Sequence, residues 1–103
     1  MIPRAFSDFL EQLRDLADRA DRERLLVLYP EFARDYPAVA ATLEQFCNAP
    51  TAEEGRAFLF AAFPPLAVLW PIAPEEWRRR LETSFYFLHE TLHGRIINGR
   101  ITE

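Results

Sequence analysis

The spacing of hydrophobic residues along the chain predicts a series of short helices. Apolar residues recur every three or four positions through residues 6–20, 39–47 and 77–92, as on amphipathic helices. Asp21 is suited to cap another helix, which we expect to end at Pro30, because an internal proline lacks a backbone donor. Pro30 and Pro37 then mark two successive helix starts. Thr51 and Glu54 have the spacing of a capping box, which predicts a helix from residue 52.

The most apolar part of the chain spans residues 57–74 and contains no charged side chain. Its length approaches that of a membrane-spanning helix, but Pro64, Pro65 and Pro71 remove backbone donors within it. These prolines argue against stable membrane insertion. We therefore expect two short helices, the first ending near Phe63 and the second starting at Pro65. They should fold back on each other and be buried on nearly all sides.

The C-terminal residues predict a hairpin. Asn98 and Gly99 lie between two short β-prone runs, and such a turn places Ile96 opposite Ile101. Gly94 is suited to end the preceding helix. A chain of 103 residues is the size of one domain. The pattern as a whole predicts an all-α fold, a compact bundle of four to six short helices over residues 1–103 with residues 94–103 as a hairpin tail.

Composition and charge limit the partners that we expect. Half of the residues are hydrophobic and 27% are charged, as in globular proteins. The net charge of −4 argues against nucleic-acid binding, which needs a clustered basic surface. The basic run Arg78, Arg79 and Arg80 forms no single patch on a helix, because successive residues point about 100° apart. The N-terminal residues lack the pattern of an export signal, so we expect a small acidic cytoplasmic protein.

Gly55 and Cys47 each predict a feature of the structure. Gly55 costs a helix about 1 kcal/mol relative to alanine, which is tolerable where another helix crosses closely. Cys47 is the only cysteine, so no internal disulfide forms, and its place on an apolar helical face predicts a buried, unreactive thiol.

The residues His89-Glu90-Thr91-Leu92-His93 resemble the HExxH motif of zinc metallopeptidases. Histidines four positions apart project from one helix face, where both can bind one zinc ion. The intervening glutamate takes a proton from the metal-bound water. The resemblance implies a zinc hydrolase with His89 and His93 as metal ligands and Glu90 as general base.

The third ligand of those enzymes has no clear counterpart in this chain. The position six residues after His93 is Gly99, and the later carboxylate is Glu103. Cys47 or Glu54 from another helix would be alternative ligands. In the other interpretation, the two histidines lie at the boundary of the buried face and bind no metal.

The chain has more large apolar side chains than a small core needs, and exposed apolar side chains often form partner surfaces. The sequence therefore favours a non-catalytic protein-interaction module without a cofactor: a small subunit, adaptor or inhibitor that binds a larger protein or a second copy of itself. The zinc hydrolase is the alternative, with zinc as its cofactor. The residues that we expect at the partner surface are Leu66, Leu69, Trp70, Ile72, Tyr86, Phe87, Ile96 and Ile101.

Overall fold

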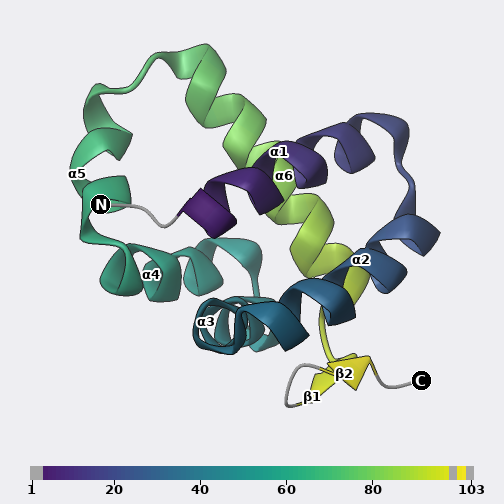
Figure 1. The fold of residues 1–103 in the computed structure, drawn as a ribbon. Helices are drawn as coiled ribbons and strands as arrows, with labels where there is room; N and C mark the ends of the chain where they lie inside the picture. Colours follow the sequence, from purple (N-terminus) through teal and green to yellow (C-terminus); the bar gives the residue numbers. More distant parts are fainter. Residues whose placement is uncertain (1–3, 98–99, 102–103) are drawn as a thin grey trace.

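The computed structural model describes residues 4–97, 100 and 101, and confirms the predicted all-α fold with a C-terminal hairpin (Figure 1). Most of this part of the chain is helical. Its elements in chain order are α1 (Arg4–Arg19), α2 (Arg22–Asp35), α3 (Pro37–Asn48), α4 (Ala52–Ala62), α5 (Pro64–Leu69), the 3-10 turn η1 (Trp70–Ile72), α6 (Glu75–Leu92), β1 (Ile96–Ile97) and β2 (Arg100–Ile101).

The helices enclose one hydrophobic core. Figure 1 shows α6 running through the middle of the molecule, with α1 crossing it, α2 at the right, α3 at the bottom, α4 at the lower left and α5 at the left edge. Phe9 of α1 stacks on Phe32 of α2, with ring centroids 4.4 Å apart. Phe6 stacks on Phe63 at 4.6 Å, which joins α1 to the end of α4. The radius of gyration, 12.7 Å, is close to the ~13 Å expected for a compact domain of this length.

Local capping positions several of these elements as predicted. The Asp21 carboxylate accepts a hydrogen bond from the Arg24 amide, and the Thr51 hydroxyl accepts one from the Glu54 amide, each at 3.1 Å. Gly94 follows the end of α6 and has a left-handed φ of +72°, a conformation that glycine often adopts where a helix ends. In the hairpin Ile96 pairs with Ile101, and the predicted turn at residues 98–99 lies outside the described residues.

The prediction that Pro30 ends a helix is wrong. The helix α2 continues through Pro30 to Asp35, and Pro37 ends it instead. Tyr36 leaves the helical region, with φ −133° and ψ 66°, because a residue that precedes proline disfavours the α conformation. Packing of the buried Phe32 against Phe9 maintains the helix beyond Pro30. The missing amide of Pro30 removes one bond without stopping the helix.

The apolar stretch 57–74 forms the predicted short helices, α4 and α5 with η1, which are bent by 117° relative to each other. The expectation that it is buried on nearly all sides is wrong. Its buried hydrophobic residues are Leu59, Phe63 and Leu66, whereas Val68 and Ile72 are 69% and 75% exposed. Figure 1 shows why: α5 lies at the edge of the molecule, so only its inner side meets the core.

None of the helices described is by itself long and apolar enough to cross a membrane. The segments Ala52–Ala62 and Pro64–Ile72 reach the required length and apolarity only when taken together, across their sharp bend.

Candidate functional site

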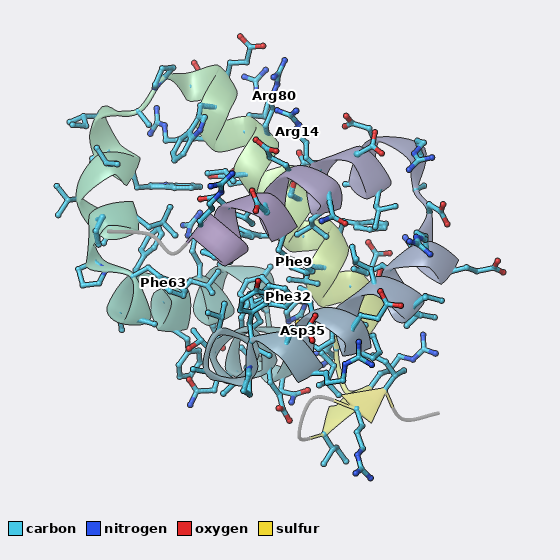
Figure 2. All side chains as sticks on the ribbon, in the orientation of Figure 1. Phe9, Arg14, Phe32, Asp35, Phe63 and Arg80 are labelled. Atoms are coloured by element: carbon cyan, nitrogen blue, oxygen red, sulfur yellow. The ribbon has the colours of Figure 1, made fainter. Side chains whose placement is uncertain are left out.

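An apolar surface at the edge of the molecule is the first candidate site. We define the α5 patch as Val68, Leu69 and Ile72, which lie within two turns of one another on α5 and η1 and are between 46% and 75% exposed. Figure 2 shows side chains extending outward from this edge. Pro64 and Pro71, also exposed, flank the patch. It therefore presents aliphatic side chains to solvent without a charged residue among them.

Aromatic rings behind the α5 patch join it to its neighbours. The Trp70 ring lies 5.5 Å from the Phe60 ring of α4 and 6.1 Å from the Trp77 ring of α6, measured between centroids. The Arg56 guanidinium lies 5.1 Å from the Trp70 ring centroid, a cation–π distance, and is 3.3 Å from a Glu82 carboxylate oxygen. These contacts hold η1 against two helices, and η1 carries Ile72 and directly follows Leu69 of α5.

The other predicted partner residues do not form one surface. Leu66, Phe87 and Ile96 are buried, at 1%, 7% and 2% exposure, and belong to the core. Ile101 and Trp70 are half-buried. Only Leu69, Ile72 and Tyr86 are strongly exposed, and Tyr86 lies on a separate face near Ala52 of α4.

Two exposed residues differ from the sequence interpretation. Trp77, the first residue of the apolar pattern over 77–92 that predicts the inner face of the last helix, is 39% exposed. Val68, the most exposed member of the α5 patch after Ile72, was not expected at a partner surface. The apolar run around Val68 gave no polar positions from which its outer side could be recognised.

The histidine pair caps the C-terminal end of α3. His89 Nε2–H donates to the Ala49 carbonyl and His93 Nδ1–H donates to the Cys47 carbonyl, each at 2.8 Å. The last carbonyls of a helix lack partners within it, and imidazole N–H groups can satisfy them. Their spacing of four positions places both rings on one side of α6, where α3 ends. The pair therefore has a structural role that the sequence motif did not indicate.

The geometry of the two rings does not suit a shared metal ion. A zinc ion lies close to the plane of each imidazole that binds it, about 2 Å from the nitrogen. The His89 and His93 rings are stacked, with centroids 4.8 Å apart and planes inclined by 26°, so their planes do not meet at that distance. No group of three His, Cys, Asp or Glu side chains within the described residues is placed to hold a metal. Glu90 instead pairs with Arg22 of α2 at 3.0 Å.

Burial makes the Cys47 thiol a poor nucleophile and a poor metal ligand. Desolvation, with a smaller contribution from Glu44, raises the pKa of the Cys47 thiol far above its ordinary 9.0. Metal binding and nucleophilic attack both require the thiolate. The same burial raises the pKa of Tyr29, whose hydroxyl donates to the Ala40 carbonyl at 3.1 Å.

Comparison of the chain with protein-family models, with curated proteins and with solved structures gave no match. The fold and the surface define an all-α domain with an exposed aliphatic patch.

Proposed function

We propose that this protein is a non-catalytic interaction module, a small subunit, adaptor or inhibitor that binds another protein through the α5 patch. The observation that carries the proposal is the exposure of Val68, Leu69 and Ile72 together on the consecutive elements α5 and η1. Isolated exposed hydrophobic residues are common on protein surfaces. A cluster of aliphatic side chains without charge among them resembles the centre of a protein–protein interface, where charged residues are depleted.

The surroundings of the α5 patch support a protein partner. Charged residues follow the patch three and four positions later in the chain, where Glu75 and Glu76 begin α6. Their carboxylates pair with Arg79 and Arg80, each at 3.0 Å. An apolar centre with a polar margin is the usual anatomy of such an interface. The partner is either a larger protein or a second copy of this chain.

Charge substitution in the α5 patch tests the proposal. Val68→Asp and Ile72→Asp should each weaken binding of an apolar dye and abolish any concentration-dependent association seen by light scattering. Both positions are mostly exposed, so the variants should remain folded. Val27→Asp on α2 is the matched control, because Val27 is 50% exposed but lies outside the patch.

The proposal fails if the unmodified protein is monomeric at all concentrations and binds no apolar dye. It also fails if Val27→Asp has the same effect as Val68→Asp. Metal analysis addresses the hydrolase alternative separately, because near-stoichiometric zinc that is lost in His89→Ala would favour it. An interaction module requires no cofactor, and the cytoplasmic location stays a prediction.

A further inference from the structure

A cavity of about 470 Å³ opens between α1 and the N-terminal half of α6. Its size lies within the ~300–1,000 Å³ of typical small-molecule sites. Figure 2 labels Arg14 and Arg80, which come from the two helices and line this cavity. The described residues that line it come from α1, α5 and the segment that begins α6.

One part of the cavity is apolar. Leu10 of α1, Leu81 of α6 and the Trp77 ring line it, with the buried Leu66 contributed by α5. Trp77 is 39% exposed although Phe85 and Leu88 on the same helix face are buried, because Trp77 lines the open cavity. Such a lining favours a ligand with an apolar body, since burying apolar surface is favourable.

Two hydrogen-bond donors of the cavity have no partner among the residues that the structure describes. Ser84 is 1% exposed and lines both this cavity and an adjoining one of about 410 Å³, yet its hydroxyl forms no hydrogen bond with the described residues. Arg14 also lines both cavities and forms no ion pair within the part of the chain described. Arg80, by contrast, is paired with Glu76 at 3.0 Å.

We propose that this cavity binds a small organic monocarboxylate with an apolar chain. The chain lies against Leu10 and Trp77, and the carboxylate accepts hydrogen bonds from the Arg14 guanidinium and the Ser84 hydroxyl. A guanidinium is a strong donor to a carboxylate, and a buried hydroxyl gains by finding an acceptor. The site goes beyond the proposed function because it does not use the α5 patch.

The acidic groups of the cavity set the charge of the ligand. Glu11 and Glu76 also line it, and Asp18 lines the adjoining cavity. These carboxylates disfavour a second negative charge on the ligand, because like charges repel at close range. Glu76 is neutralised by Arg80, so Arg14 remains the cation available to the ligand. One carboxylate is therefore expected, not two.

Calorimetric titration of the full chain with octanoate at neutral pH tests the proposal, with octanol and octylamine as comparisons. We expect octanoate to bind saturably with one molecule per chain, and both comparison compounds to bind at least about tenfold more weakly. Arg14→Gln should weaken octanoate binding by about tenfold or more, and Ser84→Ala by a smaller factor. Arg19→Gln is the matched control on α1, because Arg19 is exposed and does not line the cavity.

Three results would overturn the proposal. They are the absence of saturable octanoate binding, equal binding of octanol, and octanoate binding that is unchanged in Arg14→Gln. Arg14 is exposed, so its substitution should leave the fold intact, and the thermal unfolding of each variant verifies this. None of these outcomes depends on the α5 patch, and Val68→Asp should bind octanoate as the unmodified chain does.

Discussion

At Gly55 the backbone of α4 approaches α3 so closely that no larger residue fits. A Cβ atom at this position would lie 2.5 Å from the Phe46 carbonyl oxygen and 2.9 Å from a carbon of the Phe46 ring. Alanine would favour the helix by about 1 kcal/mol, but relieving this contact requires α3 and α4 to move apart. We therefore expect Gly55→Ala to lower the free energy of unfolding by about 1–3 kcal/mol, measured by urea denaturation.

The control for this substitution is Ala57→Gly on the exposed side of α4, which should lose only the propensity difference of about 1 kcal/mol. If Gly55→Ala stabilises the protein, the inference that α3 and α4 cross closely at this position is wrong. The sequence did predict this crossing, because a glycine inside a helix needs a compensating contact, but it could not identify Phe46 as the neighbour.

Because Tyr29 and Cys47 are buried, we expect the folded protein to lose stability at alkaline pH. Burial raises the pKa of both groups above their ordinary values of 10.0 and 9.0, so above pH 9 the unfolded chain releases protons that the folded chain retains. The free energy of unfolding therefore falls as the pH rises from about 9. The sequence contains no lysine whose titration would add to this effect.

Tyr29→Phe should reduce this fall in the free energy of unfolding at alkaline pH, because it removes one of the two titrating groups. It should also cost about 1 kcal/mol at neutral pH, since the hydrogen bond to the Ala40 carbonyl is lost. Urea denaturation at pH 7 and pH 11 measures both effects. Tyr86→Phe, at an exposed position, is the control and should keep the full decline. Equal declines in the two variants would contradict the assignment to Tyr29.

At the scale of elements, the histidine pair fixes the end of α3 to α6. His89→Ala removes a buried ring that contacts Phe46 and leaves the Ala49 carbonyl without its donor, so we expect a loss of about 2–3 kcal/mol. His93→Ala, at a more exposed position, should cost about 1 kcal/mol. Thermal unfolding with and without zinc measures both the loss and its dependence on metal.

If the histidines are caps, zinc and a chelator should leave the unfolding temperature of the unmodified chain unchanged. A rise with zinc that disappears in His89→Ala would instead support the metal site. The HExxH spacing could not distinguish these roles, because side chains four positions apart share a helix face whether they bind a metal or the end of another helix.

Helix boundaries show how far local sequence determines the elements. The junctions at Tyr36-Pro37 and Phe63-Pro64 share one backbone conformation, with φ near −130° and ψ near 70°, as expected for a residue before proline. At Pro30 the same rule predicted a helix end that does not occur, because Phe32 packs against Phe9 and α2 continues past the missing amide. Capping and proline rules thus predict candidate ends, and tertiary packing selects among them.

At the scale of the molecule, the sequence predicted the core of the amphipathic helices better than the orientation of the apolar stretch. Apolar residues spaced three or four positions apart, with polar residues between them, mark the inner face of α1, where Phe6, Phe9 and Leu13 are buried. Residues 57–74 lack polar positions, so nothing local distinguishes an inner from an outer side. The exposed members of the α5 patch follow from the position of α5 at the edge of the bundle, which only long-range packing determines.

Leu66 and Val68 therefore provide a direct test of that orientation. Leu66 is 1% exposed and Val68 is 69% exposed, although they lie two positions apart in one apolar run. Leu66→Ala should lower the free energy of unfolding by about 2–5 kcal/mol, because it leaves a cavity in the core. Val68→Ala should change it by no more than about 0.5 kcal/mol. Equal losses in urea denaturation would mean that α5 is covered on both sides, and the α5 patch would then no longer be available to a partner.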